Sequence, residues 1–134
     1  MRLWHVDLLS ALPKPQLVAQ WRELNSIYKK QDKHILINYI YNYDKTYLYE
    51  YSLCVIYELL NRHIKIRSYK NFNFYFSDLP AEFIRNDKLK YLEHDNEYLK
   101  ICYWNLREKF MRGQKDFTEE DFKKIEEIMV EKEK

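Results

Sequence analysis

Residues 1–34 read MRLWHVDLLSALPKPQLVAQWRELNSIYKKQDKH, and the fold follows from the way in which this stretch divides in two. Its first part, residues 3–12, is apolar, and the pattern there does not distinguish an extended segment from a helical one. Pro15 suits the first turn of a helix, because its missing N–H would have no partner there. After it, apolar side chains recur at helical spacing: Leu17, Trp21, Leu24 and Tyr28. The second part is therefore predicted to be a long helix with one face in the core.

A second helix is predicted over residues 45–62, with Asp44 as its N-terminal cap. One face of it carries Leu48, Ser52, Val55 and Leu59, and Ile56 and Leu60 are expected to widen that face. Residues 63–93 are predicted to be irregular. Within them the stretch NFNFYFSDLP alternates aromatic and polar residues, which is compatible with one short strand.

A third helix is predicted over residues 96–112, begun by Asp95 and ended by Gly113. A last, acidic helix is predicted over residues 118–134, because Thr118 and Asp121 have the spacing of a capping box. The expected fold is all-α: a compact single-domain bundle of three to five helices covering residues 1–134.

The composition supports an ordered globular chain. It has 134 residues, of which 46% are hydrophobic and 17% aromatic, with only one glycine and three prolines. Cys54 and Cys102 fall in apolar helical stretches and are expected to be small buried residues in a reducing compartment. No apolar run approaches the length of a membrane span, and the N-terminus lacks the pattern of a signal peptide. A soluble cytoplasmic monomer that makes no use of a membrane is expected.

The net charge of +2 is too small to indicate a partner by itself, but the charge is unevenly distributed. Residues 1–114 contain 18 Lys and Arg against 13 Asp and Glu, whereas residues 115–134 contain 5 against 8. A basic body with an acidic tail fits a partner that carries phosphates, and it also fits ordinary surface variation.

Metal and cofactor chemistry find little support in the sequence. The four histidines, His5, His34, His63 and His94, lack a second histidine at helical spacing, and no Cys-x-x-Cys pair exists. A glycine-rich phosphate loop is impossible with one glycine. A Ser/His/Asp triad stays open, although the chain has no nucleophile elbow. We expect neither a metal nor a cofactor.

The N-terminal amine is the candidate nucleophile. An α-amine has a pKa of about 7.7–8.0 against about 10.4 for lysine, so far more of it is neutral at pH 7. Nearby arginines disfavour the ammonium form, and Arg2 is adjacent while Arg22 could be brought close by folding. The large side chain of Arg2 should also prevent removal of Met1. The alternative is that the terminus is inert and that Arg22 and Glu23 form a solvated charge pair.

Four blocks of the sequence resemble the pyrimidine-dimer DNA glycosylase/AP lyase family, the phage-type endonuclease V-like enzymes. These are MRLWHVDLLSALPKPQLVAQWREL at residues 1–24, Lys33-His34, Tyr43-Asp44-Lys45 with the helix that follows, and Tyr91-Leu92-Glu93-His94 with the helix that follows. The resemblance covers residues 1–112. Three features depart from the phage enzymes: a retained Met1 replaces a small processed N-terminal residue, Ser26 replaces a further arginine, and an acidic helix replaces an aromatic, basic tail.

The resemblance implies an all-α enzyme that acts on double-stranded DNA containing damaged pyrimidines or abasic sites. The α-amine of Met1 would attack C1′ and form a Schiff base, and β-elimination would then cut the backbone. Glu23 would be the catalytic carboxylate. Arg2 and Arg22 would bind phosphates, and Lys33 and His34 would also contact DNA.

Two other functions stay open from the sequence. One is a non-catalytic module that binds distorted DNA through the same arginines. The other is a helical protein-interaction module that uses the tyrosine-rich surface. For His34, a structural hydrogen bond at the helix end is as compatible with the pattern as a phosphate contact.

Overall fold

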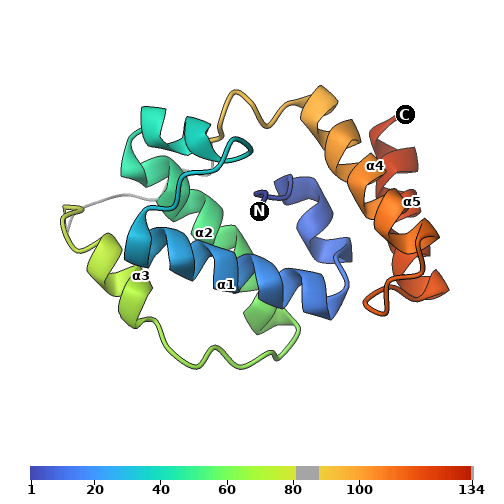
Figure 1. Cartoon of the computed structure of the whole chain (residues 1–134), viewed down its shortest axis with the longest axis horizontal. Helices are drawn as coiled ribbons and strands as arrows, with labels where there is room; N and C mark the ends of the chain where they lie inside the picture. Colours follow the sequence, from blue (N-terminus) through green and yellow to red (C-terminus); the bar gives the residue numbers. More distant parts are fainter. Residues whose placement is uncertain (81–87, 134) are drawn as a thin grey trace.

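Every regular element in residues 1–80 and 88–133, the part of the chain that the computed structural model describes, is helical (Figure 1). The α-helices are α1 (Lys14–Lys30), α2 (Lys45–Asn61), α3 (Lys70–Tyr75), α4 (Asn96–Met111) and α5 (Glu119–Lys132). Two short 3₁₀-helices, η1 (Val6–Ala11) and η2 (Asn38–Asn42), complete the set. The predicted all-α class is confirmed, and the five α-helices of the described part reach the upper end of the predicted number.

The predicted helix boundaries are confirmed where capping residues marked them. The Asp44 carboxylate accepts a hydrogen bond from the backbone N–H of Thr46 at 3.0 Å, and the Asp95 carboxylate accepts one from that of Tyr98 at 2.9 Å. Before α5, Thr118 and Asp121 bond reciprocally at 3.1 Å, which is a complete capping box. After α4, Gly113 adopts φ 76°, the left-handed conformation that closes a helix C-terminus.

The core forms around α1 and the N-terminal segment. α1 packs against α2 and α3, while η1 packs against α2, α4 and α5. Leu3, Leu8, Leu17 and Leu24 are completely buried among these elements, and α4 and α5 extend the core through Leu106 and Ile125. The acidic helix α5 therefore packs on the rest of the protein. None of the helices in the described residues has the length and apolar character needed to cross a membrane.

The segment predicted to be irregular contains the short helix α3, and the strand considered there is wrong. Phe72 and Phe76 lie four residues apart, so a helix turns both rings inward, whereas Phe74 is 78% exposed. Both inward rings pack on Tyr28 of α1, at centroid distances of 5.8 and 5.4 Å. Packing against α1 therefore selects the helical period of these aromatic residues over the alternating period of a strand. Residues 81–87 of the predicted irregular segment lie outside the described residues.

Two positions on α2 are also corrected. Ile56 is buried, but Leu60 is 49% exposed because it lies further round the helix from the buried face of Ser52, Val55 and Leu59. Cys54 is exposed because it lies off the buried face formed by Ser52, Val55 and Leu59, whereas Cys102 is buried as predicted.

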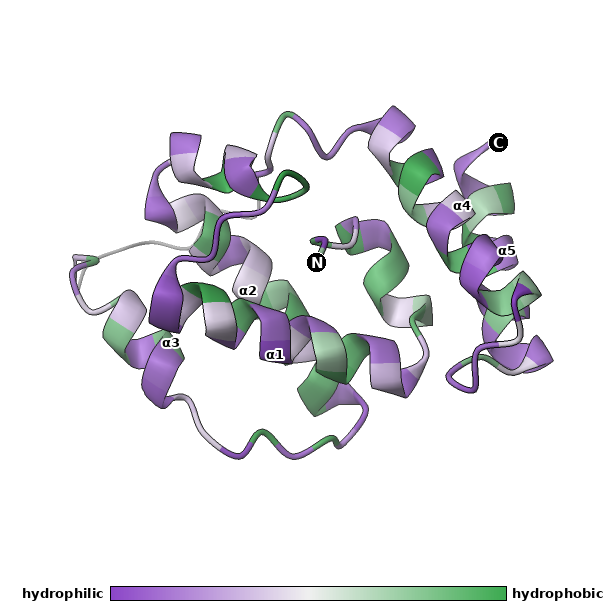
Figure 2. Cartoon of the chain, viewed as in Figure 1, coloured by the Kyte–Doolittle hydropathy of each residue, from purple (hydrophilic) through white to green (hydrophobic). Residues whose placement is uncertain are grey.

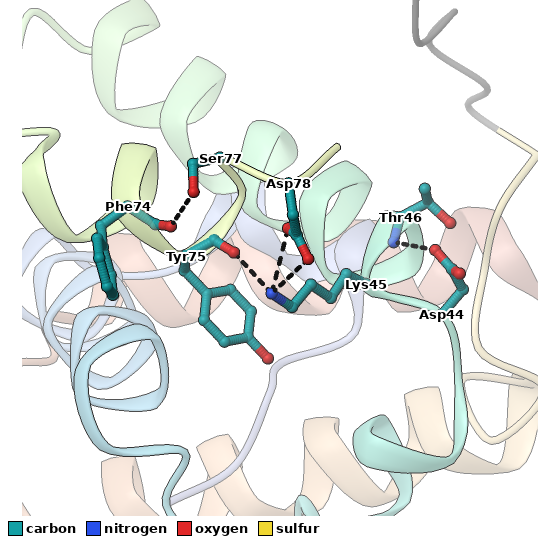
Figure 3. A network of polar contacts seen from close by, with 7 residues as sticks. All are labelled: Asp44, Lys45, Thr46, Phe74, Tyr75, Ser77 and Asp78. Carbon is teal, nitrogen blue, oxygen red and sulfur yellow. Dashed lines mark hydrogen bonds and ion pairs between the residues drawn. The ribbon is translucent and has the colours of Figure 1, made fainter. Parts of the chain in front are cut away.

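Polar contacts join the ends of the helices. At the start of α2, the ammonium of Lys45 donates to the carbonyl of Tyr75 at 2.8 Å and pairs with Asp78 at 3.3 Å (Figure 3). At the end of α2, the guanidinium of Arg62 donates to the carbonyls of Leu9 and Leu12 at 2.9 and 2.7 Å. α2 is therefore tied at one end to α3 and at the other to η1.

The Asp44 cap generates the first prediction (Figure 3). Asp44→Ala should lower the free energy of unfolding by about 1 kcal/mol, because the N–H of Thr46 loses its acceptor, whereas Asp44→Asn should retain most of it. The hydrogen bond from Thr46 lowers the pKa of Asp44, so the part of its contribution that depends on charge is present above the unfolded pKa and lost as the pH falls through the folded value. Chemical denaturation should show the gap between wild type and Asp44→Ala narrowing in acid, and a gap of unchanged size would contradict the assignment.

Candidate active site

Met1, Arg2 and Glu23 line one pocket with a volume of about 210 Å³. The N-terminal segment supplies one wall, α1 supplies the second, and α4 closes the third with Asn105 and Lys109. Figure 1 shows the N-terminus in this position, between α1 and α4. Residues distant in the sequence thus meet around Met1.

Gln20 of α1 holds the N-terminal segment in place, and its side chain is completely buried. Its amide oxygen accepts the backbone N–H of Trp4 at 2.7 Å and the hydroxyl of Tyr51 at 3.0 Å. Its amide nitrogen donates to the carbonyl of Arg2 at 3.1 Å and to the carboxylate of Glu23 at 3.2 Å. The hydroxyl of Tyr51 has one hydrogen, which it shares between the amide oxygen of Gln20 and the carbonyl of Trp4, 2.6 Å away. One buried amide therefore fixes both the path of residues 2–4 and the side chain of Glu23.

Glu23 is half-buried, and burial is the main cause that raises the pKa of its carboxyl above the ordinary value. The positive charge of the N-terminal amine lowers this pKa and so opposes the effect of burial. A hydrogen bond from the backbone of Arg2 lowers it as well, by less. The cations Arg22 and Lys109 act in the same direction as the amine. The carboxylate thus lies in a partly desolvated pocket where positive groups surround it.

The two arginines of the predicted site point to different places. The guanidinium of Arg2 lies 5.7 Å from the ring centre of Tyr98 on α4, whose hydroxyl donates to the carbonyl of Leu3 at 2.6 Å. Arg22 is exposed and lines a neighbouring groove together with Lys65 and Arg67. Arg2 is therefore part of the pocket, whereas Arg22 lies outside it and acts on Glu23 through its charge.

Lys33 and His34 lie outside the pocket, in the turn after α1. The ammonium of Lys33 lies 3.7 Å from the ring centre of Tyr41. The ring of His34 accepts the backbone N–H of Leu36 at 3.1 Å, so this histidine does make a local structural hydrogen bond. Both side chains are exposed, and the turn reaches the pocket through Leu36.

Sequence reasoning missed four polar residues that line the pocket: Gln16, Gln20, Asn105 and Lys109. Gln16 and Gln20 had a readable signal, since they share a helical face with Glu23 beside the apolar stripe of α1. Gln16 donates to Asp116 at 2.7 Å and so ties α1 to the segment before α5. Asn105 and Lys109 gave no signal, because nothing in the sequence shows which face of α4 turns towards α1.

A metal site of three or more His, Cys, Asp or Glu side chains does not occur within the described residues. The polar groups of the pocket are an amine, a carboxylate, side-chain amides and cations. This set suits a nucleophilic amine with a carboxylate beside it, and anionic ligands around them.

A family model described as pyrimidine dimer DNA glycosylase matches residues 1–71, more than half of the chain. The matched part contains Met1, Arg2, Gln20 and Glu23, and it ends within α3, before the α4 residues that complete the pocket. A comparison with curated proteins found no match, and a comparison with solved structures found none. On the family match, the chain belongs to the pyrimidine dimer DNA glycosylase family.

Proposed function

We propose that this protein is a pyrimidine-dimer DNA glycosylase with AP-lyase activity and that its nucleophile is the α-amine of Met1. The observation that carries the proposal is the shared pocket: Met1 and Glu23 line it together, within a chain that belongs to a glycosylase family. Its substrate is double-stranded DNA that contains pyrimidine dimers or abasic sites, and it works without a metal or cofactor.

The proposed reaction has two stages. The lone pair of the neutral amine attacks C1′ of the damaged nucleotide, and the glycosidic C–N bond breaks as the base leaves with the bonding electrons. Opening of the sugar ring moves a proton to O4′ and leaves an imine between C1′ and the α-nitrogen. Loss of a proton from C2′ then expels the 3′ phosphate by β-elimination, and water hydrolyses the imine to release the enzyme.

Glu23 is proposed to serve both stages. Departure of the base develops positive charge at C1′, and a carboxylate held close by stabilises it. The partly desolvated position of Glu23 strengthens this interaction, because water screens the charges less. The same carboxylate can carry protons between the amine, the sugar oxygen and C2′. Its raised pKa brings it nearer to the pH at which it must both accept and return a proton.

The cations around the pocket are proposed to bind the DNA backbone. Arg2 lies in the pocket, Arg22 lies in the groove beside it, and Lys33 and His34 project from the turn after α1. Arginine forks suit phosphate oxygens, and contacts of this kind weaken as salt displaces them.

The first prediction of the proposal concerns the covalent intermediate. Incubation with duplex DNA containing an abasic site or a pyrimidine dimer, together with borohydride, should trap an adduct that peptide mapping places on Met1. Glu23→Gln should lower the rate of strand cleavage by roughly a hundredfold or more, because it removes the ionised carboxylate and keeps the side-chain shape. DNA affinity should stay close to that of wild type. An adduct on an internal lysine, or wild-type cleavage by Glu23→Gln, would contradict the mechanism.

The second prediction concerns the N-terminus itself. One extra residue in front of Met1 should abolish trapping, because it moves the amine out of the pocket and converts the Met1 nitrogen into an amide. The DNA affinity of the extended protein should fall far less than its activity. A module that only binds distorted DNA would bind equally well with and without the extension and would trap in neither form, whereas trapping by the extended protein would show that the nucleophile is not the α-amine of Met1.

The third prediction concerns pH. Trapping requires both a neutral amine and an ionised carboxylate, so its acid limb should contain a separate step for the carboxylate, with a midpoint above the ordinary pKa of glutamate, about 4.3, because burial raises the pKa of Glu23. Lys109→Met removes a cation that lowers this pKa and should move the midpoint to higher pH, while Lys109→Arg should leave it in place. A midpoint that is the same in all three proteins would show that Glu23 does not control the acid limb.

A further inference from the structure

The turn that follows α1 ends in two exposed apolar side chains. Ile35 is 86% exposed, the highest value among the large hydrophobic residues of the described part, and Leu36 is 37% exposed. Single exposed apolar side chains are ordinary on protein surfaces, so exposure by itself indicates nothing. The rigidity of this turn and its position beside the pocket are what distinguish it.

Hydrogen bonds hold the turn at both ends. The carbonyl of His34 accepts the backbone N–H groups of Ile37 and Asn38, each at 2.9 Å. The ring of His34 accepts the N–H of Leu36 at 3.1 Å, and the N–H of His34 donates to the side chain of Asn38 at 2.7 Å. Ile37 is completely buried and anchors the turn in the core. The tip is therefore presented in one conformation, so little ordering is needed when it contacts a partner.

The turn lies at the edge of the candidate active site. Leu36 lines the same pocket as Met1 and Glu23. In Figure 2 the loop after α1 bends back towards the N-terminus, and its tip is coloured as hydrophobic. Three exposed lysines precede this tip, Lys29 and Lys30 in the last turn of α1 and Lys33 at the start of the loop. An apolar point beside a reactive pocket, next to a row of cations, fits duplex DNA: the cations meet phosphates and the point meets bases.

From these observations we infer that Ile35 and Leu36 form a wedge that enters the base stack beside the lesion, an inference that rests on the proposed function. The attacked carbon, C1′, lies inside the duplex at the junction of sugar and base. An amine that is recessed in a pocket reaches it only if the stack opens at that step. Ile35 takes the place of the lost stacking contact, and Leu36 covers the side of the pocket next to the opened step. Apolar side chains that enter a base step and kink the duplex act in this way.

The test compares Ile35→Ser with Leu92→Ser on the same abasic site, first in duplex DNA and then in single-stranded DNA. Leu92 is the matched control, because it is 83% exposed and does not line the pocket. Ile35→Ser should slow borohydride trapping on the duplex by roughly tenfold, since the apolar contact that offsets unstacking is lost. Trapping on single-stranded DNA should stay within about twofold of wild type, because no stack has to open there. Leu92→Ser should trap both substrates at the wild-type rate. Ile35→Leu, which keeps a large apolar side chain, should trap the duplex at a rate close to that of wild type.

A second readout needs binding alone. A 2-aminopurine base placed next to the abasic site becomes brighter when its stacking is lost. Saturating wild-type protein should raise its fluorescence in the duplex, and Ile35→Ser at saturation should not. Equal duplex trapping by Ile35→Ser and wild type, or an equal rise in fluorescence, would overturn the wedge. A wild-type protein that traps neither substrate would refute the proposed chemistry instead, and the fluorescence measurement would still decide the wedge.

Discussion

The buried amide of Gln20 is the interaction on which the rest of the site depends. Its oxygen accepts two hydrogen bonds and its nitrogen donates two, so all of its polar capacity is used at a position with no solvent exposure. A buried polar group left without partners costs about 1–3 kcal/mol, so displacement of any partner is penalised. The path of the chain at Arg2 and Trp4 is therefore determined by α1. Without this amide the N-terminal segment would have only its apolar side chains to hold it, and these do not specify where its backbone lies.

The pKa of Glu23 results from two opposing effects, burial and the positive charges nearby. Burial disfavours the carboxylate, whereas the N-terminal amine, a backbone N–H and two cations favour it, and the pKa stays raised. Such an arrangement keeps a partly desolvated carboxyl in the same pocket as Met1. The same helix that supplies Gln20 supplies Glu23 three residues later, so the group that fixes the terminus and the carboxylate beside it share one rigid support. The proposed reaction needs such rigid support, because in it an amine and a carboxylate act on the same carbon.

The pocket is completed by parts of the chain that lie far from α1 in sequence. Asn105 and Lys109 reach it from α4, and Tyr98 of α4 holds both the side chain of Arg2 and the backbone of Leu3. These α4 residues lie outside residues 1–71, the part of the chain that matches the family model. The hydrogen bond from Gln16 to Asp116 ties α1 to the segment before α5, and within α5 the ammonium of Lys132 lies 3.2 Å from Asp7 of η1. The C-terminal helices thus brace the N-terminal wall of the pocket, and the negative charge of α5 lies behind that wall.

The sequence by itself determined the four long helices, α1, α2, α4 and α5, and the capped ends of the last three, because these depend on neighbours along the chain: Asp44, Asp95, Thr118 and Gly113 each act within one turn. It also identified Met1, Arg2 and Glu23 as candidates, through the chemistry of an α-amine and the resemblance of the first block. It did not reveal the helix at Lys70–Tyr75, since the period of the aromatics there is ambiguous until Tyr28 packs against Phe72 and Phe76. Nor did it reveal that Arg22 lies outside the pocket, whereas Asn105 and Lys109 line it. Only the tertiary structure decided these points, because the direction in which a helix turns its polar face depends on which distant segments bury the other face.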